Sequence, residues 1–198
     1  METPRLLPMA DSVPVERSDA ARNREILMEA AARLIERCGV DSVTMDAVAE
    51  EAGVGKGTVF RRFDSRAGLM GALLNHSESA WQASVLSGPP PLGPGAPPLE
   101  RLLAFGQSRI ELHLRHSDLI RAAGAAATRN YAAYSFTAMH VRYLLDQLDV
   151  RGDIALLATA ILAPLEMVIL DQLVLKEHVS IERIHAAWAD LVRRVVAG

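Results

Sequence analysis

Val43–Phe63 reads VTMDAVAEEAGVGKGTVFRRF, and this stretch decides the fold of the 198-residue chain. It divides into two short helical segments at Gly53, a residue that can take the positive φ angle needed to end the first segment. Val48 and Ala49 give the first segment an apolar face, and Val59 is placed to pack the second segment against it. This arrangement predicts a helix-turn-helix, a motif whose second helix enters the major groove of DNA.

The second predicted helix has the composition of a nucleic-acid contact. Gly55 and Gly57 leave little side chain at its N-terminus, where free N–H groups and the helix dipole attract phosphate. Lys56 adds a positive charge, and Thr58 can reach a phosphate or a base edge. Further cations follow at Arg61, Arg62 and Arg66, opposed only by Asp64. The whole chain has a net charge of −3, so its overall charge does not indicate nucleic-acid binding. The indication comes from this local cluster of cations.

The segment and its flanks resemble the DNA-binding domain of the TetR family of repressors. The resemblance covers about residues 20–75: an amphipathic first helix, the pattern G-V-x-S-V-T-M-x-A-V-A-x-x-A-G-V-x-K-G-T-V-F-x-x-F, and a further helix opening at Ser65-Arg66. The rest of the chain agrees with the family in length and helical pattern only. The resemblance implies an all-α fold: an N-terminal three-helix helix-turn-helix domain, then a C-terminal helical domain for ligand binding and dimerisation.

The resemblance also implies roles for single residues at the DNA interface. Thr44 would cap the second helix and touch phosphate. Lys56 would contact the DNA backbone, while Gly57 and Thr58 would face the groove. Arg61 and Arg62 would meet phosphates or bases.

Three positions depart from the usual family pattern. Arg66 stands in place of a phosphate-binding Lys, and Phe60 replaces a Tyr whose hydroxyl donates to phosphate. Gly55 replaces a Ser or Pro. The full set of expected DNA-binding residues is Thr44, Gly55, Lys56, Gly57, Thr58, Phe60, Arg61, Arg62 and Arg66.

Composition favours helix along the rest of the chain. Half of the residues are hydrophobic and 23% are charged, which is typical of a globular protein. Six of the ten prolines lie within 89–98, so the remaining sequence is free to form helices. We expect helices at about 18–37, 44–51, 55–62, 65–86, 99–115, 118–128, 130–148, 153–176 and 180–197.

These helices and prolines suggest the domain organisation. We expect a disordered tail at 1–17, which lacks the pattern of a secretory signal, and the DNA-binding domain at 18–64. A ligand-binding and dimerisation domain would follow at 65–198, with a Pro-rich loop at 87–98. Cys38 is the single cysteine, so no intrachain disulfide can form, which suits the reducing cytoplasm.

The most apolar stretch of the chain runs from Ile154 to Leu175. Glu166 and Asp171 interrupt it, and carboxylates in the middle of a membrane span are costly, so we expect a protein interface there and no membrane. The helices at 153–176 and 180–197 either cover only their own core or pair with a second copy as a four-helix interface. We favour the homodimer, because one helix-turn-helix reads too few bases for tight specificity. The apolar stripes are Ile154, Leu157, Ile161, Leu165, Val168 and Leu175, followed by Ile184, Trp188, Leu191 and Val195.

The family resemblance places a ligand pocket among the middle helices. Its candidate residues, each equally compatible with ordinary core or surface, are Trp81, Phe105, His113, Tyr134, His140, Glu166 and Met167. The apolar bias of the chain favours a mainly hydrophobic ligand with a few polar anchors. His113 and His116 lie three residues apart, but no cysteine or second histidine pair accompanies them, so we expect no metal and no cofactor.

These patterns predict a cytoplasmic repressor that a small-molecule effector releases from a palindromic operator of double-stranded DNA. The alternative is a helical small-molecule-binding protein or an enzyme that does not act through DNA. The sequence shows no serine-elbow or Cys–His signature. A phosphate-binding loop fails as well, because Gly57 stands where Ser or Thr must follow Lys56.

Overall fold

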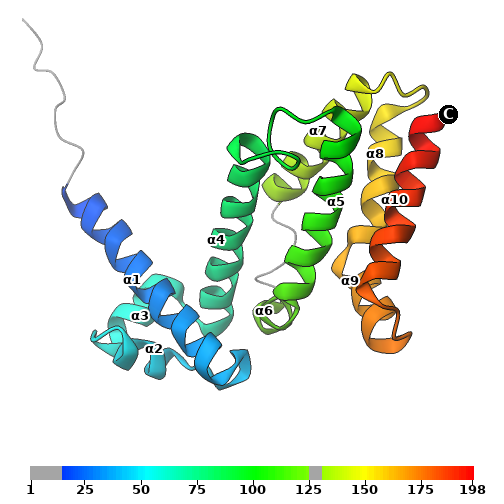
Figure 1. The fold of residues 1–198 in the computed structure, drawn as a ribbon. Coiled ribbons are helices and arrows are strands. Elements are labelled where there is room, and N and C mark those ends of the chain that lie inside the picture. Colours follow the sequence, from blue (N-terminus) through cyan, green and yellow to red (C-terminus); the bar gives the residue numbers. More distant parts are fainter. Residues whose placement is uncertain (1–14, 125–130) are drawn as a thin grey trace, which may run out of the picture. The chain divides into compact units, whose positions relative to one another are not determined.

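The computed structural model describes residues 15–124 and 131–198, leaving aside the side chains of 15–20 and 131–134. Throughout this part of the chain the regular elements are helices (Figure 1), which confirms the all-α expectation. Two compact units divide the chain: an N-terminal unit at 1–69 and a C-terminal unit at 70–198. The division therefore falls five residues beyond the boundary expected at 64.

The N-terminal unit is a three-helix domain. Its helices are α1 (Val15–Cys38), α2 (Met45–Glu51) and α3 (Lys56–Phe63), with a 3-10 turn η1 (Val40–Ser42) and the start of α4 (Arg66–Ser87). Helix α1 begins inside the expected tail, whose residues 1–14 lie outside the described residues. The core gathers the apolar faces of the three helices, namely Leu27, Ala30, Ala31, Leu34, Val43, Val48, Ala49, Val59 and Phe63.

Two local devices build the expected helix-turn-helix. Thr44 caps α2, its hydroxyl oxygen accepting a hydrogen bond from the backbone N–H of Ala47 at 3.1 Å. Gly53 follows α2 with a φ of 67°, which confirms the positive φ expected at this turn. Val59 and Phe63 then bury one side of α3. The opposite side of α3 is left for solvent or a partner.

The C-terminal unit packs helices around one apolar core. After α4 come α5 (Pro98–Arg115), α6 (Ser117–Ala123), α7 (Tyr131–Gln147), α8 (Ile154–Leu162), α9 (Met167–Asp171) and α10 (Ile181–Ala197). Helix α5 contacts both α7 and α10, and α8 lies beside α10 (Figure 1). Large buried side chains at the centre are Leu102, Phe105, Ile110, Leu144, Leu145, Ile161 and Leu170.

The prediction of a single helix at 153–176 is wrong, because the structure divides this segment into shorter helices and turns. A 3-10 turn η3 (Ala163–Leu165) follows α8, Glu166 is extended, and a π-helical turn η4 (Gln172–Lys176) follows α9. Pro164 supplies the physical reason, since proline lacks the N–H of a helical hydrogen bond and its ring clashes with the preceding turn.

The helix expected at 118–128 ends at Ala123 in the described part of the chain. Gly124 follows with a φ of 49°, a positive value that favours glycine. Residues 125–128 of that expected helix lie outside the described residues.

The segment Ile154–Lys176 keeps much of its apolar surface exposed. It has a mean hydropathy of 2.0 and is only 28% buried over its most apolar window, and by length and composition it is long enough to cross a membrane. Part of the stripe expected to form a dimer interface packs into its own subunit instead, namely Ile161, Leu165, Ile184 and Trp188. Five apolar side chains on this segment and at the start of α10 are exposed, and they are termed the exposed apolar face: Leu156, Val168, Ile169, Leu175 and Ile181.

Candidate nucleic-acid interface

The N-terminus of α3 lacks a side-chain cap. Its N-cap residue is Gly55, at φ −68° and ψ 141°, and no side chain accepts a hydrogen bond from the first turn. By contrast, Thr44, Asp153 and Ser180 cap α2, α8 and α10. Helix N–H groups without a cap, together with the positive end of the helix dipole, suit an external anion such as phosphate.

Gly55 and Gly57 are not required by the fold. A Cβ atom built on either residue meets nothing within 4 Å, and neither residue has a positive φ. Glycine at a helical position is less stable than alanine by about 1 kcal/mol. The structure itself therefore gives no reason for Gly57, whereas close approach of an outside backbone would.

Exposed cations lie at both ends of α3. The Lys56 ammonium pairs with the Asp46 carboxylate at 2.5 Å, and both side chains are more than half exposed, at 68% and 56%. Such surface pairs contribute about 0–1 kcal/mol to stability, so little stability is lost if Lys56 leaves Asp46 to bind a phosphate. Arg61 and Arg62 are exposed in the last turn of α3. Phe60 is exposed between these charges.

Arg66 has an internal function in this structure. Its Nε donates to the Val43 carbonyl at 2.8 Å and its Nη2 donates to the Val40 carbonyl at 2.6 Å. These bonds tie the start of α4 to the loop that leads into α2. The phosphate contact expected of Arg66 stays a prediction, as do the DNA contacts of Thr44, Thr58 and the other expected residues.

Glu51 holds α2 against α1, a role that sequence reasoning missed. Its carboxylate accepts from Arg37 at 2.7 Å and from Arg33 at 3.1 Å. The hydrogen bond from Arg37 and then that from Arg33 lower the pKa of Glu51. The partners lie 14 and 18 residues apart along the chain, so only the packing of the two helices brings them together.

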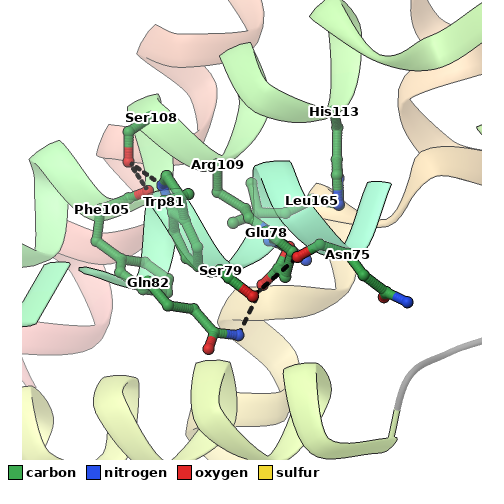
Figure 2. Close-up of polar contacts among 10 residues, drawn as sticks. All are labelled: Asn75, Glu78, Ser79, Trp81, Gln82, Phe105, Ser108, Arg109, His113 and Leu165. Carbon is green, nitrogen blue, oxygen red and sulfur yellow. Dashed lines mark hydrogen bonds and ion pairs between the residues drawn. The ribbon is translucent and has the colours of Figure 1, made fainter. Parts of the chain in front are cut away.

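In the C-terminal unit, three of the candidate ligand residues form one aromatic cluster. The ring centroids of Trp81 and Phe105 lie 5.1 Å apart, and those of Phe105 and His140 lie 5.2 Å apart. Phe136 extends the cluster beside Trp81 and His140. The Trp81 indole donates through Nε1 to Ser108 Oγ at 3.0 Å (Figure 2).

An ion pair that the sequence did not suggest lies beside this cluster. Arg109 of α5 pairs with Glu78 of α4 at 2.5 Å, and both side chains are mostly buried, at 13% and 17% exposure. The same guanidinium stacks over the Trp81 ring at 4.7 Å (Figure 2). Helix α4 is thereby fixed against α5 by charge, hydrogen bonding and ring contact together.

The other candidate ligand residues lie apart from the aromatic cluster. His113 Nδ1 is 2.7 Å from the carbonyl oxygen of Leu165 at the break after α8. Burial, reinforced by the charge of Arg109, lowers the pKa of His113 to about 4, so the ring is neutral at pH 7. Glu166 and Met167 follow that break and are half-buried. Tyr134 belongs to α7, but its side chain lies outside the described residues.

A separate pocket of about 310 Å³ lies between α10 and the broken segment after α8. Pro164, Leu173 and Trp188 are among its walls, and it contains none of the candidate ligand residues. Within the described parts of the chain, no group of three His, Cys, Asp or Glu side chains is placed to hold a metal ion.

The N-terminal part of the chain matches a known family. Residues 27–73 fit the family model described as bacterial regulatory proteins, tetR family. A helix-turn-helix-type transcriptional regulator of Staphylococcus aureus (strain USA300) is 38% identical over 53 residues, which are 27% of this chain and 29% of that relative. The match to the curated relatives thus spans under a third of their length.

Solved structures extend the similarity of fold to most of the chain. A Mesorhizobium loti protein assigned to the TetR family has 17% identity and a TM-score of 0.60, over 90% of this chain and 96% of that one. A transcriptional regulator from Saccharomonospora viridis, solved in complex with choline, has 20% identity and a TM-score of 0.63, over 87% and 96%. These identities support a shared fold and leave the choline as a property of that protein.

Proposed function

The chain belongs, through its N-terminal domain, to the tetR family of bacterial regulatory proteins, and we propose that it is a cytoplasmic repressor whose homodimer is released from operator DNA by a small molecule. The observation that carries this proposal is the uncapped N-terminus of α3, a helix that bears exposed cations at both ends. It also bears two glycines that the fold does not need.

The proposed contact places α3 in the major groove. The backbone of Gly55 and Gly57 approaches a phosphate closely, and Lys56 leaves Asp46 to pair with the same or a neighbouring phosphate. Arg61 and Arg62 extend the contact from the other end of the helix. Such contacts release counterions, so binding should weaken steeply as salt rises.

The proposed dimer buries the exposed apolar face. Val168 is 82% exposed, and the other members of the face lie on the same broken segment or at the start of α10. A second copy would remove this apolar surface from water without a membrane. Twofold symmetry then implies a palindromic operator whose half-sites are centred about 34–36 Å apart, one turn of DNA.

The proposed effector site includes the aromatic cluster of Trp81, Phe105 and His140. This cluster contacts α4, and α4 starts at Arg66 in the DNA-binding domain. A ligand that favours a different placement of α4 would shift the population of DNA-binding dimers. Coupling of about 1–3 kcal/mol would weaken DNA binding about 5- to 150-fold.

Selection of bound duplexes from a random pool tests the proposal, followed by anisotropy titrations at several salt concentrations. We expect a palindromic consensus, and we expect Lys56→Ala and Arg61→Ala to lower affinity. Each lost phosphate contact should also reduce the slope of log affinity against log salt by about one. Arg193→Ala, an exposed arginine on α10, is the matched control and should bind as the wild type does. Failure of the protein to bind any duplex at low salt would refute the proposal.

A further inference from the structure

Three side-chain nitrogen atoms in the described part of the C-terminal unit are buried without a hydrogen-bond partner: Arg101 Nε on α5, His140 Nε2 on α7 and His185 Nε2 on α10. The first two lie on helices that contact each other. A buried polar atom left unsatisfied costs about 1–3 kcal/mol. Two such atoms on neighbouring helices therefore call for a specific explanation.

Arg101 and His140 lie on the contacting helices α5 and α7. His140 is 7% exposed, and its ring stacks on Phe105 with an interplanar angle of 28°. Arg101 lies four residues before Phe105 and so projects from the same side of α5. Its positive charge adds to burial in lowering the pKa of His140 to about 4.

Arg101 differs from Arg109 in its partners. Arg109 is neutralised by Glu78, whereas no carboxylate among the described residues pairs with Arg101. Arg101 makes a long hydrogen bond of 3.5 Å from Nη2 to the Val85 carbonyl. A half-buried positive charge therefore stands one helical turn before Phe105, with its Nε–H donor unused.

We propose that Arg101 and His140 form an anion subsite of the effector pocket and that the effector is an organic carboxylate with an apolar body. The proposal rests on the proposed function, because it names the ligand class of the same aromatic site. One carboxylate oxygen would accept from Arg101 Nε–H and the other from His140 Nε2–H. Phe105, Phe136 and Trp81 would contact the apolar body.

A monoanion fits this subsite better than a dianion. His140 is neutral at pH 7, so Arg101 supplies the single unneutralised charge. One carboxylate balances that charge, whereas a phosphate dianion would leave a second charge buried and unpaired. The aromatic surroundings likewise favour a ligand with an apolar body.

The experiment uses the full-length protein without DNA and a panel of matched probes: benzoate, 4-phenylbutyrate, octanoate and decanoate, each against its primary amide. Binding is followed by calorimetry and by the chemical shifts of the His140 ring. We expect at least one carboxylate to bind ten-fold or more tightly than its amide and to shift the His140 Nε2 resonance.

Arg101→Met and His140→Phe should each remove that preference. Because both changes delete an unsatisfied buried nitrogen, neither should lower the melting temperature, which separates a binding role from a structural one. Arg142→Gln, an exposed arginine on α7, is the matched control and should bind as the wild type does.

Equal binding of carboxylates and amides, or binding that survives Arg101→Met, would overturn the proposal. So would a crystal structure in which one buried water satisfies both nitrogens while every carboxylate fails to bind. These outcomes leave the DNA-binding test untouched, and a protein that binds carboxylates but no duplex would refute the repressor function alone.

Discussion

Gly57 and Gly68 are both helical glycines, yet their surroundings differ. A Cβ on Gly68 would lie 2.1 Å from the carbonyl oxygen of Phe63, so packing requires glycine there. A Cβ on Gly57 would meet no atom of the described residues within 4 Å. The sequence presents the two residues alike, and only the structure shows that packing requires glycine at Gly68 and does not require it at Gly57.

Gly57→Ala should therefore change stability and DNA binding in opposite directions. We expect the free energy of unfolding to rise by up to about 1 kcal/mol, because alanine favours helix. Affinity for the selected operator should fall, because the new methyl group holds the DNA backbone away. Urea denaturation and anisotropy titration measure the two effects. Gly68→Ala is the control and should destabilise the protein. Wild-type DNA affinity in Gly57→Ala would contradict close approach at this residue.

Residue-level prediction succeeded where the signal was local. The cap at Thr44 and the positive φ of Gly53 follow from neighbours within a few positions, and both are present. The bonds of Arg66 and the Glu78–Arg109 pair were missed. Their partners lie 23 to 31 residues away in the sequence, so tertiary packing decides them.

At the scale of elements, the broken segment after α8 is where sequence reasoning failed. Its apolar pattern continues across Pro164, and periodicity alone therefore predicted one helix. The break leaves carbonyl groups without helical donors, and side chains from other helices supply them. Trp188 Nε1 donates to the Ile161 carbonyl at 2.9 Å, and His113 approaches the Leu165 carbonyl. Helices α10 and α5 thus hold the break in place.

The burial of His113 makes the stability of this element depend on pH, because burial lowers the pKa of its ring. The folded-state pKa is about 4 and the unfolded value is 6.5, so the unfolded chain binds more protons between these values. Stability is therefore complete above pH 6.5 and falls as the pH drops toward 4. His113 should account for a loss of about 2 kcal/mol between pH 7 and pH 5, at about 1.4 kcal/mol per pKa unit.

Urea denaturation of wild type and His113→Gln at pH 7 and pH 5 measures this contribution. The variant should lose about 2 kcal/mol less than the wild type over this interval. His140, whose pKa is also lowered to about 4, remains in both proteins and adds the same dependence to each. His76→Gln, an exposed residue on α4, serves as the control. Identical pH dependence in wild type and His113→Gln would contradict a neutral, buried His113.

For the whole molecule, the exposed apolar face is the feature that a single chain leaves in contact with water. The apolar stripes expected from the sequence were apolar enough for an interface. Their helical spacing alone did not distinguish residues that face the subunit's own core from residues that face a partner. The structure separates them, because Ile161 and Trp188 are buried while Val168 and Leu175 are exposed. The break at Pro164 divides the segment into elements with different helical periods, so one 3.6-residue period does not describe it.

Val168→Glu should convert the proposed dimer into monomers. A carboxylate at the centre of an apolar contact is costly to bury, but the residue is 82% exposed in the single chain, so the fold should persist. Analytical ultracentrifugation would measure the mass. Binding to the full palindrome should weaken by about 10²–10⁴-fold through lost avidity, while binding to an isolated half-site stays unchanged. Met139→Glu places the same charge on α7, at a residue 63% exposed, and should remain dimeric. A dimeric Val168→Glu protein would show that another surface joins the two copies. If the wild-type protein is monomeric and binds lipid vesicles, the exposed apolar face would instead be a membrane-binding surface.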